Sequence, residues 1–330
     1  MRIDVHAHHY PAEYIDLLIS LGRTDINPRV GQSNDLSERI ARLDAAGIDQ
    51  QILCPIGLDT IVPNREGAVQ AAQCVNDAYA EILTRYGGRF QAFGWVPLPY
   101  ADEAIEEAKR CLDELGFAGI GLACAYQGRS LDDPDFEAFW AALNQRQAVV
   151  YIHPVGEHSC GHWGMDRYTL DILVGSPNQE TIAASRLVYS GITRRYPDIR
   201  FVLAGCGGSL ALLWEVHENL LKAAFGPGMS LQGWVRETGL SAQDPMSEFR
   251  KFWVDTANQG SPSLLYAAAA KFGVDHLLLG SDAPHGSEAL AIVQVQGCEM
   301  LDQSQKQLII EHNANNFFNK EGCLVNVIKA

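Results

Sequence analysis

Short apolar runs alternate with longer amphipathic stretches along the whole chain. Eight runs are typical of β-strands, at residues 3–6, 51–54, 90–96, 118–123, 149–153, 200–204, 252–255 and 276–280. Stretches between them, such as SERIARLDAAG and EAIEEAKRCLDELG, repeat their apolar residues every three or four positions, which is the helical period. Both stretches end in glycine, a common helix stop. The pattern therefore predicts strands and helices in alternation.

This alternation predicts a parallel sheet covered by helices, because strands that are apolar throughout are buried on both faces. Eight strand–helix units in 330 residues predict an α/β fold of the (β/α)8 TIM-barrel type. A doubly wound open sheet is the alternative, but no G-x-G-x-x-G follows the first strand, and the nearest glycine-rich turn, AGCGGSL, follows the sixth. With no linker or repeat, we expect residues 1–330 to form one domain, with long loops at 156–167 and 227–247.

Composition narrows the classes of function. Hydrophobic residues make up 47% of the chain and the formal net charge is −15, which suits a globular protein and disfavours binding to nucleic acid or anionic membranes. The eight cysteines are scattered without a C-x-x-C pair, so we expect reduced thiols and a cytoplasmic protein. No signal peptide and no apolar run long enough for a membrane helix are found. A small-molecule substrate is therefore favoured.

The predicted barrel brings distant polar residues to one place, since active sites of this fold lie at the C-terminal ends of the strands. The opening sequence, DVHAHH, puts two imidazoles on one face of the first strand, because side chains alternate between faces. Alone, this short H-x-H pattern is also compatible with ordinary loop polarity. The fifth strand ends in histidine and the eighth runs into SDAPHG. Three imidazoles and a carboxylate suit zinc or another divalent first-row metal, and we expect such an ion to be held by His6, His8, His153 and Asp282.

These motifs also carry a family resemblance. DVHAHH, YIHP and LLLGSDAPHG, together with segments such as RLDAAGID, RFQAFGWVPL and FWVDT, resemble the amidohydrolase superfamily of metal-dependent barrels. The branch that the chain most resembles is the aminocarboxymuconate-semialdehyde decarboxylase type, which includes γ-resorcylate decarboxylase. The resemblance implies the same four metal ligands and a carbon–carbon lyase that acts on a small aromatic or unsaturated carboxylic acid, often as a homodimer. Zn²⁺ is the first choice of ion, with Mn²⁺ and Fe²⁺ as alternatives.

One stretch departs from that branch. After the sixth strand, its members typically read alanine-histidine-glycine-glycine-glycine, whereas residues 204–208 of this chain read AGCGG. The resemblance implies that the histidine helps to deprotonate a metal-bound water, which Gly205 cannot do. Hydrolysis needs an activated water, so the change favours a lyase over a hydrolase of a lactone or related small molecule. A metal-binding member with altered or lost activity is a further alternative.

Several residues are candidates for the remaining roles. Asp282 can pass a proton to the substrate, although an aspartate before PHG also suits a helix N-cap. A histidine of the loop GEHSCGHWG can replace the missing imidazole, with plain loop polarity as the alternative. We expect Asp255 to cap its strand or hold a neighbour. The candidate catalytic residues are Asp282, His158, His162 and His285, and the candidate substrate-binding residues are Gly205, Cys206 and Arg29.

Overall fold

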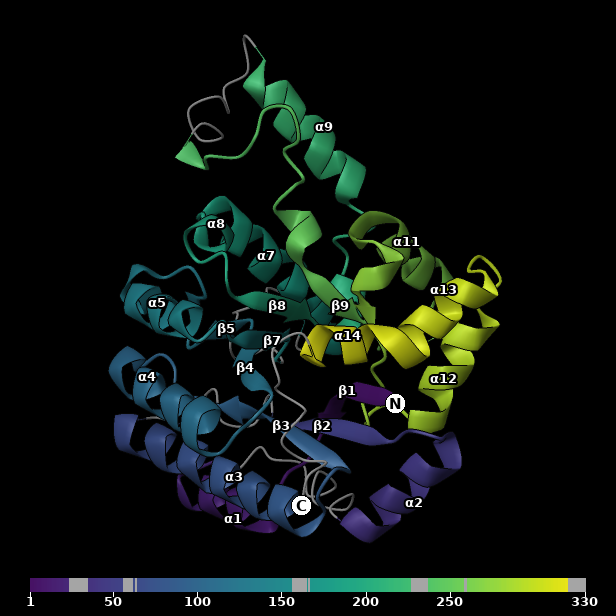
Figure 1. Ribbon diagram of the computed structural model, residues 1–330. Coiled ribbons are helices and arrows are strands. Elements are labelled where there is room, and N and C mark those ends of the chain that lie inside the picture. The colour runs from purple at the N-terminus through teal and green to yellow at the C-terminus, as the bar shows by residue number, and fades with distance from the viewer. Residues whose placement is uncertain are drawn as a thin grey trace.

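The computed structural model describes residues 1–23, 35–55, 62, 64–155, 165, 167–226, 237–257 and 260–319. Eight parallel strands lie at the centre of the molecule and helices surround them (Figure 1). Neighbouring strands follow one another in the sheet as β1 (Ile3–His8), β2 (Gln50–Cys54), β3 (Phe90–Trp95), β4 (Gly119–Ala123), β7 (Val149–His153), β8 (Arg200–Leu203), β9 (Trp253–Asp255) and β10 (Leu277–Leu278). All eight predicted strands are present, with small differences at their ends.

The sheet closes because the last strand returns to the first. The backbone N–H of Val5 donates a hydrogen bond of 2.9 Å to the carbonyl of Leu279, and the N–H of His8 donates one of 2.6 Å to the carbonyl of Ala283. A further parallel bridge joins Ala7 to Ala283. The (β/α)8 barrel predicted from the sequence is therefore confirmed, and the open-sheet alternative is wrong.

Helices cover the outside of the barrel, and local signals set their ends. The Asp35 side chain accepts hydrogen bonds from the N–H groups of Ser37 and Glu38, and Gly47 ends the same helix in the left-handed conformation (φ 66°). The helices are α1 (Ala12–Ser20), α2 (Leu36–Ala46), α3 (Arg65–Arg85), α4 (Ala101–Lys109), α5 (Glu137–Gln145), α7 (Ser176–Tyr189), α8 (Ile192–Arg195), α9 (Trp214–Phe225), α11 (Pro262–Phe272), α12 (Glu288–Gly297), α13 (Gln303–Gln307) and α14 (Asn313–Asn319).

Side chains fill the interior of the barrel. The ring of Phe93 on β3 stacks on that of Tyr151 on β7, with centroids 5.0 Å apart, and both are fully buried. Strand residues such as Ile52, Ile120 and Ile152 are also excluded from solvent. The barrel is therefore a packed core, and chemistry is confined to its ends.

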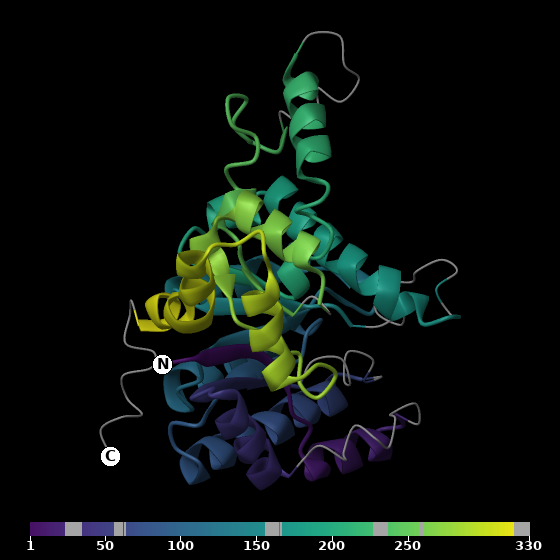
Figure 2. The ribbon, with the colours of Figure 1, turned by 90° about the vertical axis from the view of Figure 1, so that its right-hand side faces the viewer.

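One helix stands away from this core. In both views, α9 projects from the barrel beyond the other helices (Figures 1 and 2). Its first residue, Trp214, is buried against the rings of Phe249 and Phe272, which anchors one end of the helix. The expected loop at 156–167 lies largely outside the described residues, as does much of that at 227–247.

No disulfide joins the described cysteines, which are Cys54, Cys74, Cys111, Cys124, Cys206 and Cys298. Among the described helices, none is both long enough and apolar enough to cross a membrane. The small hairpin β5–β6 (Ala125–Tyr126 and Arg129–Ser130) follows β4 and is the one described sheet outside the barrel.

Candidate metal centre

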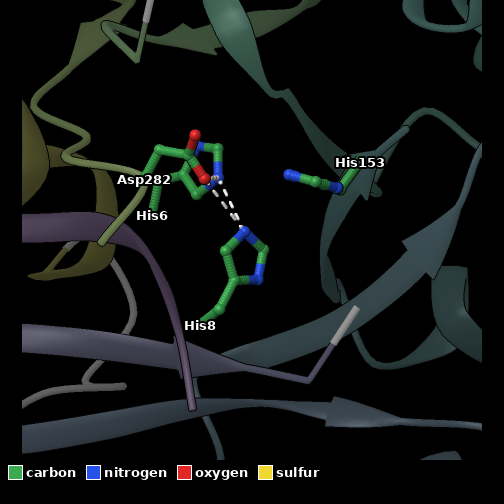
Figure 3. Close-up of side chains that lie close together, drawn as sticks. All are labelled: His6, His8, His153 and Asp282. Carbon is green, nitrogen blue, oxygen red and sulfur yellow. Dashed lines mark hydrogen bonds and ion pairs between the residues drawn. The ribbon is translucent and has the colours of Figure 1, made fainter. Parts of the chain in front are cut away.

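Four side chains meet at the C-terminal ends of the strands (Figure 3). His6 and His8 come from β1, His153 ends β7, and Asp282 follows β10. One oxygen of Asp282, Oδ1, lies 3.2 Å from Nε2 of both His6 and His8, and these two nitrogens are also 3.2 Å apart. The ring of His153 points toward the others from the side of β7, and all four ligand atoms lie within 4.8 Å of one another. The structure thus brings together the four residues selected from the sequence.

Backbone carbonyls orient two of the imidazoles. Nδ1 of His8 lies 3.2 Å from the carbonyl oxygen of Cys54, and Nδ1 of His153 lies 2.6 Å from that of Pro154. A carbonyl can only accept a hydrogen bond, so each Nδ1 carries the proton. Each Nε2 is then left unprotonated and able to bind a metal ion.

A carboxylate orients the third imidazole. Nδ1 of His6 lies 2.9 Å from Oδ2 of Asp255, the last residue of β9. The same oxygen accepts a hydrogen bond of 2.9 Å from the hydroxyl of Tyr151. Asp255 is completely buried. A carboxylate behind a metal-binding histidine fixes the tautomer of the ring and raises its basicity.

The surroundings favour neutral imidazoles at His8 and His153 and an ionised carboxylate at Asp282. Burial lowers the pKa of His8, and burial together with the nearby His8 and His6 holds the pKa of His153 well below its usual value. Burial alone would raise the pKa of Asp282, but the imidazoles of His6 and His8 beside its carboxylate outweigh burial and hold that pKa well below the usual range. For His6 burial is likewise outweighed, here by Asp255 and Asp282, which raise its pKa.

This donor set fits one divalent metal ion. Three imidazole nitrogens and one carboxylate oxygen are ligands that zinc and its first-row neighbours take, and metal binding requires them to be unprotonated. Two ligand atoms at about 2.0 Å from one ion, at tetrahedral angles, are roughly 3.3 Å apart. The separations of 3.2 Å among His6, His8 and Asp282 match that spacing. An ion bound there would also offset the negative charge of Asp282 in a half-enclosed site.

The turn after β8 is joined to the site through Asp255, which contacts both the N–H of Gly205 and the imidazole of His6. Four successive residues, Gly205, Cys206, Gly207 and Gly208, have positive φ angles between 56° and 74°. At Gly205 an added Cβ would meet only the carbonyl oxygen of Ala257, at 3.4 Å, so the missing side chain leaves space. At Gly208 an added Cβ would come within 2.2 Å of the Pro177 carbonyl oxygen, which requires glycine there.

A family model described as amidohydrolase matches residues 3–320. The chain belongs to the amidohydrolase family. The resemblance inferred from the sequence motifs is therefore confirmed over almost the whole chain.

Relatives of this amidohydrolase include decarboxylases. It is 26% identical over 289 residues to 2-amino-3-carboxymuconate-6-semialdehyde decarboxylase of Dictyostelium discoideum, covering 86% of this chain and 76% of that one. It is 26% identical over 265 residues to γ-resorcylate decarboxylase of Rhizobium sp., covering 74% and 76%. The structure of 5-carboxyvanillate decarboxylase from Novosphingobium aromaticivorans, which contains bound manganese, superposes with a TM-score of 0.82 at 22% identity, covering 97% of each chain.

The other candidate residues of the amidohydrolase lie at different distances from the centre. The ring of His285 is 5.4 Å from that of His8, and His285 is exposed at the rim. Cys206 is completely buried inside the turn after β8. His9 is buried beside Tyr79 and takes no part in the ligand cluster. Arg29, His158 and His162 lie outside the described residues.

The sequence did not single out two inner groups. Tyr151 precedes His153 by two positions, so strand alternation places both on the same face and could have indicated it. Glu180 on α7 is buried, and neither of its carboxyl oxygens has a hydrogen-bond partner of good geometry. Burial and the nearby Asp255 raise its pKa well above the usual value. A helical glutamate gives no sequence signal of this kind, because its burial depends on the packing of α7 against the barrel.

Proposed function

We propose that this amidohydrolase is a metal-dependent carboxy-lyase that decarboxylates a small aromatic or unsaturated carboxylic acid. The observation that carries the proposal is the position of Asp282, whose carboxylate lies 3.2 Å from the imidazoles of His6 and His8 and whose side chain is 17% exposed. The relatives with the same family fold support it, since they act on muconate-semialdehyde and resorcylate carboxylates.

The four clustered residues would hold the ion, which when bound supplies Lewis-acid chemistry and a template for the substrate carboxylate and a neighbouring oxygen. Asp282, as an ionised group, first accepts a proton from the substrate hydroxyl and then delivers it to the carbon that bears the carboxylate. The bond to the carboxylate carbon breaks, CO2 leaves, and the released electron pair restores the ring. No water molecule has to be activated on this route.

Gly205 and His285 shape the space beside that centre. Because Gly205 has no side chain, the ring of the substrate can occupy the volume in which the decarboxylase branch carries an imidazole. His285, exposed next to His8, is placed to contact the substrate or exchange protons at the rim. Roles for Cys206, Arg29, His158 and His162 remain predictions from the sequence.

Zinc is the ion we propose, because imidazole nitrogens dominate the ligand set. Manganese and iron are the alternatives, and the manganese in 5-carboxyvanillate decarboxylase is a reason to compare them directly. Loading metal-free protein with each ion in turn and measuring CO2 release would rank the three.

We further propose a homodimer in the cytoplasm. The projecting helix α9 exposes Val216 (51%) and Leu220 (50%), and Leu212 just before it is 59% exposed. Apolar side chains on a helix that leaves the protein body favour burial against another surface, and a second copy of the chain offers the same helix. The scattered cysteines are the basis for the cytoplasmic location.

A hydrolase of a lactone or related small molecule is the second candidate, because the amidohydrolase fold also supports a metal-activated water. A parallel assay separates the two. Metal-loaded protein is incubated with 2,6-dihydroxybenzoate, 6-methylsalicylate, 5-carboxyvanillate and a set of lactones, while CO2 and ring opening are both measured. We expect CO2 from a hydroxybenzoate at a higher kcat/KM than any lactone opening. Rapid lactone opening with no CO2 would overturn the lyase.

A further inference from the structure

One buried carboxylate joins the candidate metal centre to the turn beside it. Oδ2 of Asp255 faces Nδ1 of His6 and the hydroxyl of Tyr151, each at 2.9 Å. Oδ1 accepts hydrogen bonds from the backbone N–H of Gly205 at 3.1 Å and of Ala257 at 2.9 Å. Asp255 has no exposed surface. A single side chain thus contacts β1, β7, the turn after β8 and the segment after β9.

These contacts fix how His6 can bind a metal ion. Oδ2 already accepts from the hydroxyl of Tyr151, and a carboxylate has only acceptor positions. His6 must therefore donate its Nδ1 proton, which leaves Nε2 as the electron-pair donor toward His8 and Asp282. Mutation of a carboxylate in this position, behind a histidine that binds a metal ion, typically lowers metal affinity by about 10–100-fold.

The other oxygen of Asp255, Oδ1, holds the backbone of Gly205, the residue at which the sequence departs from the decarboxylase branch. Gly205 adopts φ 56°, a conformation that costs any residue with a Cβ. Since Gly205 has no side chain of its own, its N–H is the group through which Asp255 holds it. A shift of Gly205 therefore pulls on the same carboxylate that orients His6.

We propose that Asp255 is a positioning residue that couples the orientation of the metal ligand His6 to the backbone of Gly205. Changes in the turn that borders the substrate space then alter metal affinity through Asp255. The proposal rests on the metal site of the proposed function but not on the reaction. A protein that binds metal through this coupling and releases no CO2 would refute the reaction alone.

The test measures metal affinity of the full-length protein by competition with a chromophoric chelator, using Zn²⁺, and records the visible absorption of the Co²⁺ form. Asp255→Asn keeps the shape of the side chain but removes one acceptor. We expect its Zn²⁺ affinity to fall by about 10–100-fold, with a changed Co²⁺ spectrum. Gly205→Ala, which shifts the turn, should lower the affinity severalfold and alter the same spectrum.

Two matched controls separate positioning from general damage. Gly116→Ala places a Cβ at a glycine with a similar φ of 67° and open space around it, away from the site. It should carry a similar backbone strain and leave Zn²⁺ affinity unchanged. Glu180→Gln alters a buried carboxyl near Asp255 that makes no hydrogen bond to a ligand imidazole, and should also leave the affinity within about threefold.

The double variant Asp255→Asn with Gly205→Ala decides the coupling. If Asp255 transmits the shift, adding Gly205→Ala to Asp255→Asn causes no further loss of affinity. Additive losses would show that the turn and His6 are independent and would overturn the proposal, as would native affinity and an unchanged Co²⁺ spectrum in Asp255→Asn. If Asp255→Asn does not fold, Gly205→Ala against Gly116→Ala still decides, because equal affinities in that pair contradict the coupling.

Discussion

The backbone N–H of Asp282 donates a hydrogen bond of 2.8 Å to the carbonyl oxygen of His6. This bond continues the pairing between the last and first strands beyond the end of β10 (Leu277–Leu278), so barrel closure itself carries the carboxylate to the imidazoles. Asp282 adopts φ 57°, a left-handed conformation that aspartate tolerates better than most residues, and its side chain turns back over the strand end. The metal centre is therefore built by the closure of the fold.

Replacing both His6 and His8 by alanine should abolish metal binding. The remaining His153 and Asp282 offer two ligand atoms, fewer than the three protein ligands that catalytic zinc sites typically have. Metal analysis of purified protein should give close to one equivalent for the parent and only a trace for the variant.

His285→Ala is the matched control, because its ring is also close to His8 but lies outside the ligand cluster. It should keep its metal. Full occupancy in the His6 and His8 double variant, or loss of metal in His285→Ala, would contradict the assigned ligands.

The barrel and the four clustered residues could be predicted because both follow from short-range patterns. Continuous apolar runs marked the strands, and the rule that parallel strands end at one face brought His6, His153 and Asp282 together. The first strand was predicted to end at residue 6 but continues to His8. The polar sequence around His8 is also typical of a loop, although His8 is buried in the site.

The partners that orient the site were not predictable in the same way. Nδ1 of His8 and of His153 face backbone carbonyls, which every residue has, so no residue type signals them. The hydrogen bond that the N–H of Gly205 donates to Asp255 depends on the left-handed turn after β8, which only the packed structure defines. Asp255 was expected to hold a neighbour, and that neighbour is His6.

Acid should destabilise the protein through His9. Burial, with a contribution from the Arg39 guanidinium, lowers the pKa of His9 to about 3, whereas an unfolded histidine has a pKa near 6.5. The unfolded state therefore binds more protons below pH 6.5, so this contribution to stability is present at neutral pH and is lost as the pH falls toward 3. Below pH 3 the loss has an upper bound of about 5 kcal/mol.

His9→Leu should reduce that dependence. Urea unfolding of metal-free parent and variant at pH 7 and pH 4 measures it, and the variant should lose less stability between the two. His312→Leu removes an exposed histidine instead and serves as the control. Equal losses in the parent and in His9→Leu would show that His9 does not limit acid stability.

Charge on the projecting helix should break the proposed homodimer. Val216→Asp with Leu220→Asp places two carboxylates on the exposed apolar side of α9, where burial against a second chain would desolvate them. Light scattering should give a dimer mass for the parent and a monomer mass for the variant. Leu290→Asp, at an equally exposed leucine (55%) on α12, should remain a dimer. A monomeric parent, or a dimeric α9 variant, would refute the interface.

Gly205→His should close the space that we assign to the substrate ring. A Cβ built at this position meets only the Ala257 carbonyl oxygen, at 3.4 Å, so the first atom of the added side chain has room. With metal kept at a saturating level, we expect bound metal to stay unchanged while KM for the decarboxylated substrate rises at least about tenfold, which corresponds to roughly 1.4 kcal/mol of binding. Gly205→Ala carries the same backbone strain without the ring, so its KM should rise far less. A Gly205→His variant that instead gains activity on 2-amino-3-carboxymuconate-6-semialdehyde or 2,6-dihydroxybenzoate would contradict this assignment. It would show that the glycine reflects loss of an ancestral reaction and that the substrate ring does not occupy this space.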